Sequence, residues 1–239
     1  MDTVLKGADS IFSTNNLTSA TKRVYEYLYE EIVSCRLVPG TALSEMALSQ
    51  LLKTSRTPVR EATMALEGEG LINRYPKRGC FVSKITAQDV NEIFSLRKLL
   101  EVAALRQANP LADMHNLRDL EQALLVLSPK GKPKDYFDID RRLHNLLVVN
   151  CGNMRLIMII QTLNGQIEQF RRISSMQPQR LSESKAEHLG IVRSLMNSDL
   201  EHTCALLECH IENVRASTLS VCLKMGLRDI QNGSDSDTI

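Results

Sequence analysis

Residues 53–67 read KTSRTPVREATMALE, and this stretch decides the fold of the N-terminal part of the chain. Ser55 is a good N-cap, because its hydroxyl can accept a hydrogen bond from an amide of the first helical turn. Pro58 is tolerated in that turn, where the amides lack partners within the helix. The stretch therefore predicts a helix that begins near Arg56.

The predicted helix has an apolar side and a basic side. Three apolar residues recur at the spacing of one helix face: Val59, Ala62 and Leu66. Arg56 and Arg60 are four residues apart and share a different face, with the hydroxyl of Thr57 beside them. A guanidinium group can bind guanine edges or phosphates. For this helix taken alone, a solvated basic face is the simpler interpretation.

The neighbouring sequence favours DNA binding. An apolar helical pattern runs from Ser19 to the Val-Pro-Gly break at residues 38–40, and a second helix follows Ser44, a predicted N-cap. Residues 53–55 then form a tight turn into the basic helix, which is the helix-turn-helix arrangement. Residues 71–75 and 80–83 predict two strands around a basic turn that ends at Gly79, where a positive φ is expected. This hairpin would be a wing, the alternative being a surface hairpin with incidental charges.

Composition limits the class of protein. The 239 residues suffice for two domains, and the net charge of +1 means that any affinity for DNA must come from a local patch. Six scattered cysteines without a C-x-x-C pair, and no N-terminal signal segment, predict reduced thiols and a cytoplasmic protein. No apolar run approaches the roughly 20 residues of a membrane span. Residues 1–18 predict a flexible arm, and residues 227–239 a flexible tail.

The chain changes character near Lys84. Residues 19–84 form the predicted winged helix-turn-helix domain, and residues 85–226 an all-helical domain. Six helical patterns with short breaks cover residues 87–108, 111–127, 134–150, 153–174, 180–197 and 199–224. Six helices joined by short loops predict an antiparallel bundle, so the fold class is mainly α.

Four residues of the bundle could bind a metal ion. Asp140 and His144 are four apart on one helix, while His188 and His210 each lie near the middle of a later helix. Three helices could bring this carboxylate and three imidazoles to the bundle axis, and such ligands suit zinc, nickel, iron and manganese. From spacing alone, unrelated surface or core histidines are an equally good interpretation. His115 and His202 do not fit the set and are expected to be exposed.

Four motifs carry a resemblance to a known family: LSE at 43–45, SRTPVREA at 55–62, LEGEGL at 66–71 and RGCFV at 78–82. Residues 21–83 resemble the winged helix of GntR regulators, and residues 89–224 resemble the FadR C-terminal (FCD) domain, closer to its six-helix VanR-like branch. The resemblance implies a bacterial regulator, a repressor, that binds a palindromic operator as a homodimer. The family's DNA contacts fall on Ser55, Arg56, Thr57, Arg60 and Gly79, with Lys77 and Arg78 beside them in the wing. Met46 stands where many members have an Arg.

The resemblance also implies the chemistry of the helical domain. Many FCD domains bind a metal through Asp-x-x-x-His and two later histidines, and Asp140, His144, His188 and His210 match this pattern. Zinc is the first candidate, with nickel, manganese and iron as others. Open coordination positions would receive a small effector, commonly an organic acid. Arg97 matches an Arg of the first effector-domain helix and would clamp a carboxylate, unless it only forms a surface pair with Glu101. Arg172 faces the same alternative.

Two other functions compete with the effector-responsive regulator. A metal site with three histidines and one carboxylate could activate water in a hydrolase. However, no separate acid or base stands at a recognisable spacing, and an enzyme would not require a winged helix, so we do not expect an enzyme. In the other alternative, the metal itself is the signal.

Overall fold

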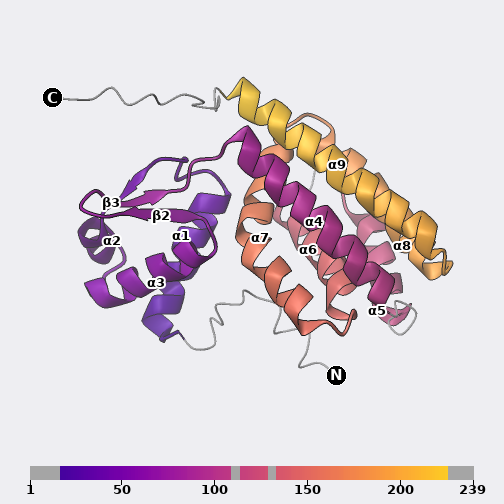
Figure 1. Ribbon diagram of the computed structural model, residues 1–239, viewed down its shortest axis with the longest axis horizontal. Coiled ribbons are helices and arrows are strands. Elements are labelled where there is room, and N and C mark those ends of the chain that lie inside the picture. Colours follow the sequence, from indigo (N-terminus) through magenta and orange to yellow (C-terminus); the bar gives the residue numbers. More distant parts are fainter. Residues whose placement is uncertain (1–16, 109–113, 129–132, 226–239) are drawn as a thin grey trace.

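The computed structural model describes residues 17–108, 114–128 and 133–225. Residues 1–16 of the predicted arm and all of the predicted tail lie outside these residues. The described chain forms two parts, a small N-terminal domain with a sheet and a larger helical domain (Figure 1). This is the mainly α fold that the sequence predicts. The N-terminal elements are α1 (Ser19–Val33), β1 (Ala42–Leu43), α2 (Glu45–Leu51), α3 (Arg56–Gly68), β2 (Ile72–Tyr75) and β3 (Gly79–Val82).

Helices α1 and α3 form the core of the N-terminal domain. The apolar stripe of α3 is fully buried against apolar residues of α1: Val24, Leu28, Ile32, Val59, Ala62 and Leu66. The short helix α2 begins where Ser44 accepts a hydrogen bond from the amide of Ala47 at 3.2 Å. Helix α3 begins at Arg56, as predicted.

The predicted capping bond of Ser55 is wrong, because its hydroxyl accepts no hydrogen bond from the helix. An N-cap side chain usually bonds to the third residue of the helix, as Thr18 does with the amide of Thr21. In α3 that third residue is Pro58, which has no N–H. The exposed Ser55 hydroxyl is therefore left available to another partner.

The sheet has three antiparallel strands in the order β1-β3-β2. β2 and β3 are the predicted wing, shifted by one residue at their ends, and Gly79 has the expected positive φ of 101°. Lys77 in the same turn also has a positive φ, of 63°. The sequence does not predict β1, which pairs Ala42 with Phe81. Two residues are too short to show an alternating pattern.

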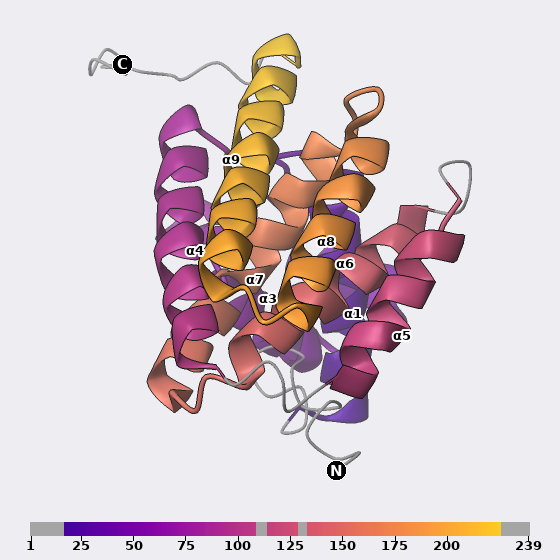
Figure 2. The same ribbon diagram turned by 90° about the vertical axis from the view of Figure 1, so that its right-hand side faces the viewer.

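Six helices form the described part of the second domain, as predicted: α4 (Ala87–Gln107), α5 (Met114–Val126), α6 (Pro133–Val149), α7 (Met154–Ser174), α8 (Arg180–Met196) and α9 (Leu200–Lys224). Helix α4 begins with a capping box, in which the side chains of Thr86 and Asp89 each accept a hydrogen bond from the other residue's backbone N–H. Helix α9 lies between α4 and α8 in Figure 2 and packs against both, as well as against α7. Phe94 and Phe170 stack within this core, their ring centroids 6.0 Å apart. None of the described helices is long and apolar enough to span a membrane.

The two domains meet where α1 packs against α7. Gln169 of α7 donates a hydrogen bond to the carbonyl oxygen of Ile32 at 3.2 Å. Gly165 permits a close approach, because a Cβ there would lie 2.9 Å from Leu71 Cδ1 and 3.1 Å from Glu69 Oε2. A side chain at residue 165 would therefore collide with the N-terminal domain.

Candidate metal centre and ligand cavity

The basic face of α3 lies in solvent. Arg56, Thr57 and Arg60 are exposed, while the apolar stripe on the other side of the helix is buried. Met46 of α2 is also 53% exposed. The helix can therefore present two guanidinium groups and a hydroxyl outward without disturbing its packing.

The wing adds further positive charge. Lys77, Arg78 and Gly79 are all exposed at the turn between β2 and β3. Arg74, which precedes them, is instead engaged within the domain, where it pairs with Glu45 at 3.1 Å and Glu67 at 3.3 Å. The basic residues that remain at the surface are therefore those of the turn itself.

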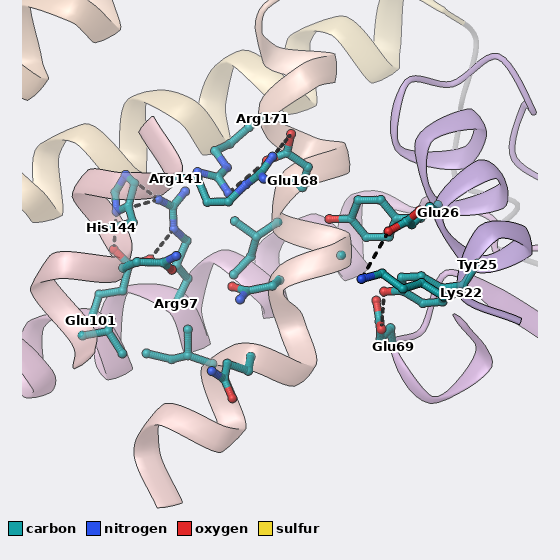
Figure 3. A pocket seen from close by; sticks show the side chains of 18 residues that line it. Lys22, Tyr25, Glu26, Glu69, Arg97, Glu101, Arg141, His144, Glu168 and Arg171 are labelled. Carbon is teal, nitrogen blue, oxygen red and sulfur yellow. Dashed lines mark hydrogen bonds and ion pairs between the residues drawn. The ribbon is translucent and has the colours of Figure 1, made fainter. Parts of the chain in front are cut away.

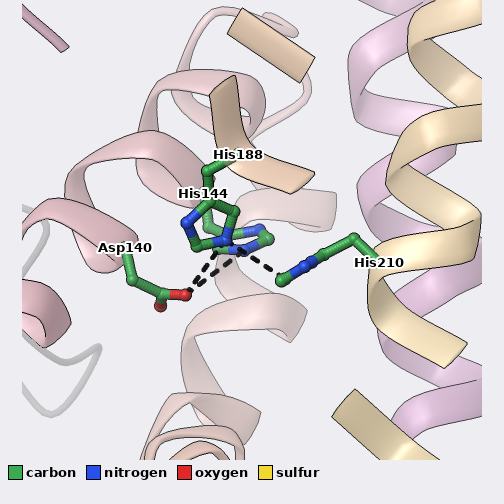
Figure 4. A group of neighbouring side chains, drawn as sticks. All are labelled: Asp140, His144, His188 and His210. Carbon is green, nitrogen blue, oxygen red and sulfur yellow. Dashed lines mark hydrogen bonds and ion pairs between the residues drawn. The ribbon is translucent and has the colours of Figure 1, made fainter. Parts of the chain in front are cut away.

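The four predicted metal ligands come together inside the bundle. Asp140 and His144 come from α6, His188 from α8 and His210 from α9, and all four are buried (Figure 4). One ligand atom from each lies within 4.8 Å of the others. His188 Nε2 is 3.3 Å from His210 Nε2 and 3.3 Å from Asp140 Oδ1. The alternative of unrelated histidines is therefore excluded, and His115 and His202 are exposed as expected.

Two outer carboxylates orient the imidazoles. Glu101 Oε2 lies 2.8 Å from His144 Nδ1, and Glu187 Oε2 lies 2.6 Å from His210 Nδ1. A carboxylate that accepts the Nδ1 proton leaves Nε2 unprotonated, as in the carboxylate–histidine–metal arrangement. Burial lowers the pKa of His210 to about 3 and also lowers the pKa values of His144 and His188. All three rings are thus neutral at pH 7, the form that binds metal.

A divalent cation fits this set of donors. His188 Nε2 lies 3.3 Å from both His210 Nε2 and Asp140 Oδ1, and His188 Nδ1 has no hydrogen-bond partner among the described residues. Imidazole nitrogen and carboxylate oxygen are common zinc ligands, and nickel, manganese and iron accept them as well. The donor set therefore suits the metals that the sequence predicts.

Two buried arginines contact the same cluster. Arg97 Nη2 lies 2.9 Å from His144 Nε2, and Arg171 Nη1 forms an ion pair with Asp140 Oδ2. Arg97 also pairs with Glu101 at 2.7 Å. That pair was predicted as a surface alternative, but Arg97 is 0% exposed, so it is a buried pair. Burial lowers the pKa of Arg171 to about 9, which leaves it protonated at neutral pH.

A chain of ion pairs connects Asp140 to the DNA-binding domain. Arg171, which forms the ion pair with Asp140, also contacts Glu168 Oε2 at 3.1 Å. Glu168 Oε1 in turn accepts a hydrogen bond from Arg172 Nε at 2.9 Å. Arg172 then binds Glu30 of α1 with two hydrogen bonds of 2.8 and 3.1 Å. The Asp140 cluster and α1 are thus joined by contiguous charged contacts.

A cavity of about 200 Å³ lies beside the cluster and extends to the N-terminal domain (Figure 3). His144 is the cluster residue that lines it. Three arginines line it as well: Arg97, Arg141 and Arg171. Nη1 of Arg97 and Nε of Arg171 are buried without an acceptor among the described residues. Unmatched buried donors of this kind suit an oxygen-rich ligand.

One predicted effector residue lies outside the wall of this cavity. Arg97 lines the cavity, but Arg172 is not among its lining residues and binds Glu30 and Glu168 instead. Its neighbour Arg171 occupies the cavity wall. Successive helical residues point about 100° apart, so only the packing of α7 decides which of two adjacent arginines faces inward.

Residues 92–213, just over half of the chain, match the FCD domain family, and residues 20–82 match the bacterial regulatory proteins of the gntR family. The chain belongs to the FCD domain family and carries a GntR-type DNA-binding domain. It is 27% identical over 210 residues to the HTH-type transcriptional repressor RspR of Escherichia coli K12, with 87% of this chain and 92% of that protein covered. This GntR protein is thus a DNA-binding transcriptional regulator with an effector-binding domain.

Solved structures share the fold of this GntR regulator. A GntR transcriptional regulator from Rhodococcus sp. RHA1 has a TM-score of 0.68 at 23% identity, covering 85% of this chain and 99% of that one. The Zn²⁺-bound FCD domain of the regulator TM0439 has a TM-score of 0.52 at 20% identity, covering 60% and 99%. These likenesses concern the fold, and the second neighbour is a domain with zinc bound.

Proposed function

We propose that this GntR regulator is a repressor that binds a palindromic operator as a homodimer. Because bacterial DNA lies in the cytoplasm, we propose that location for the protein as well. Each protomer places α3 in the major groove, and the wing contacts the adjacent backbone or minor groove. Seven residues carry the contact: Ser55, Arg56, Thr57, Arg60, Lys77, Arg78 and Gly79. Their shared exposure supports this assignment, as does the Ser55 hydroxyl that α3 does not use.

The dimer is supported by apolar residues that α4 and α7 expose. Leu99 of α4 is 64% exposed, and Met154, Met158 and Ile159 of α7 are 65%, 49% and 49% exposed. Exposed apolar groups on two neighbouring helices are typical of an interface between subunits. A two-fold dimer would set two α3 helices at a fixed spacing, which a palindromic site requires.

We propose further that the bundle holds one divalent metal ion per chain, zinc in the first place. The observation that carries this is the convergence of four buried ligand atoms, two of them oriented by outer carboxylates. Asp140, His144, His188 and His210 would hold the ion, which when bound supplies a positive centre for a ligand oxygen. Arg97 and Arg171 would bind the rest of an anionic effector, a small organic acid, from the cavity side.

Metal analysis of the purified chain tests this proposal. We expect about one divalent ion per chain in protein prepared without chelator, and its loss in His188→Ala and His210→Ala. His202→Ala is the matched control, since this exposed histidine of α9 lies outside the cluster. A DNA duplex that the protein binds can be selected from random sequences. Titrating organic acids into the protein–DNA complex then shows whether they release the protein from this duplex. Wild-type protein that neither contains nor takes up metal would disprove the centre, and release by metal alone would favour the metal as the signal.

A further inference from the structure

The ligand cavity belongs to both domains. Helix α1 of the DNA-binding domain contributes four residues to its wall, Lys22, Tyr25, Glu26 and Tyr29, and Glu69 follows α3. The opposite wall comes from α4, α6 and α7 of the bundle. Figure 3 shows the labelled residues in two groups on either side of the cavity. A molecule that fills the space would therefore contact the DNA-binding domain directly.

The end of the cavity at the bundle is suited to an anion. At this end the three arginines outnumber the two carboxylates, Glu101 and Glu168, even without the charge of a metal ion. Arg97 is 0% exposed and Arg171 is buried, and each keeps a nitrogen without an acceptor among the described residues. A ligand carboxylate would satisfy these donors with charge-assisted hydrogen bonds.

The end at α1 has a different chemistry. The lining residues there include two acidic side chains, Glu26 and Glu69, and one basic side chain, Lys22. The Lys22 ammonium pairs with Glu26 at 3.9 Å. The rings of Tyr25 and Tyr29 stack with centroids 5.8 Å apart, and the Tyr25 hydroxyl donates to Glu69 at 2.6 Å. An excess of carboxylates beside aromatic rings favours a cation and disfavours a second carboxylate.

We propose that the cavity binds an ω-amino acid across the domain boundary, with its carboxylate against Arg97 and Arg171 and its ammonium against Glu26, Tyr25 and Tyr29. This inference rests on the proposed function, because it assigns the ligand class of the same effector cavity. The ligand contacts both domains only while α1 is docked on α7. Binding therefore favours the docked arrangement and changes the freedom of α3 to meet DNA.

Isothermal titration calorimetry on the Zn²⁺-loaded full-length chain tests the ligand class. The probes are 5-aminopentanoate and 6-aminohexanoate, with pentanoate and glutarate as analogues that lack the amine or replace it by a carboxylate. We expect one of the two amino acids to bind about tenfold more tightly than pentanoate, and glutarate to bind no better than pentanoate.

Variants of α1 test whether the DNA-binding domain takes part. Glu26→Gln and Tyr29→Phe should each weaken binding of the amino acid by about three- to tenfold and leave pentanoate unchanged. Tyr27→Phe is the matched control, because Tyr27 lies on the same helix but does not line the cavity. Circular dichroism and zinc content would show that each variant is folded and loaded.

The outcomes separate this inference from the proposed function. If an amino acid binds equally to wild type, Glu26→Gln and Tyr29→Phe, the bundle alone forms the site and the inference is wrong, although the proposed function stands. If neither amino acid binds while zinc binds normally, the ligand class is wrong. If zinc itself does not bind, the proposed function fails and the inference fails with it.

Discussion

Replacing Gly165 with alanine should weaken the contact between the two domains. Alanine in a helix interior normally stabilises by up to about 1 kcal/mol relative to glycine. Here the new Cβ would lie 2.9 Å from Leu71 Cδ1 and 3.1 Å from Glu69 Oε2. Leu71 is 1% exposed within the N-terminal core, so it has little room to move, and overpacking of this kind costs about 1–3 kcal/mol. We expect net destabilisation of roughly 0–2 kcal/mol.

Gly190→Ala is the matched control for this prediction. Gly190 lies inside α8, and its added Cβ would meet Leu206 Cδ1 at an ordinary 3.7 Å. Only the propensity gain of about 0.5–1 kcal/mol applies there, so the two variants should differ by about 1–3 kcal/mol in urea unfolding. If Gly165→Ala proves as stable as Gly190→Ala, the close approach of α7 to the N-terminal domain is not tight, and the reasoning is refuted.

Two further predictions concern DNA and acid. Arg56→Ala and Arg60→Ala should each weaken operator binding by about 1–3 kcal/mol in a fluorescence anisotropy titration. Arg118→Ala, on the exposed surface of α5, is the control and should leave the affinity unchanged. If Arg56→Ala and Arg60→Ala both bind the operator as tightly as wild type, α3 is not part of the DNA interface. Burial lowers the pKa of His210 to about 3, so below about pH 6.5 the unfolded chain takes up a proton that the folded chain does not. The free energy of unfolding of metal-free protein should therefore fall as the pH falls from about 6.5 towards 3. This fall should be less steep in His210→Gln and as steep as in wild type in His202→Gln. A free energy of unfolding that does not change with pH in wild type would contradict the buried neutral imidazole.

Local signals explain what the sequence could predict of the fold. The start of α3 at Arg56 and its buried stripe depend on residues within one helix, and the six bundle helices depend on apolar periodicity. The missed strand β1 is defined by its partner Phe81, far along the chain, and not by a pattern of its own. The capping hydrogen bond of Ser55 was wrongly predicted because its hydroxyl needs a backbone N–H as donor, and Pro58 has none.

The site was predictable where family pattern and helical spacing agree. Asp140 and His144 share a face of α6 because they are four residues apart. The outer carboxylates were not predictable, since Glu101 and Glu187 meet their histidines only after helices pack. Arg171 was missed for the same reason. Contacts between distant helices leave no periodic trace in the sequence.

The ion pair between Arg172 and Glu30 bears on how such regulators can be recombined. A hybrid that joins another winged helix to this bundle would bring its own DNA sequence preference but a foreign α1. Without an acid at the position of Glu30, Arg172 would lose its partner across the boundary. A foreign α1 would also replace Lys22, Tyr25, Glu26 and Tyr29, which form part of the cavity wall. Grafting that retains the inward face of α1 should preserve the response, so the unit of exchange is smaller than the DNA-binding domain.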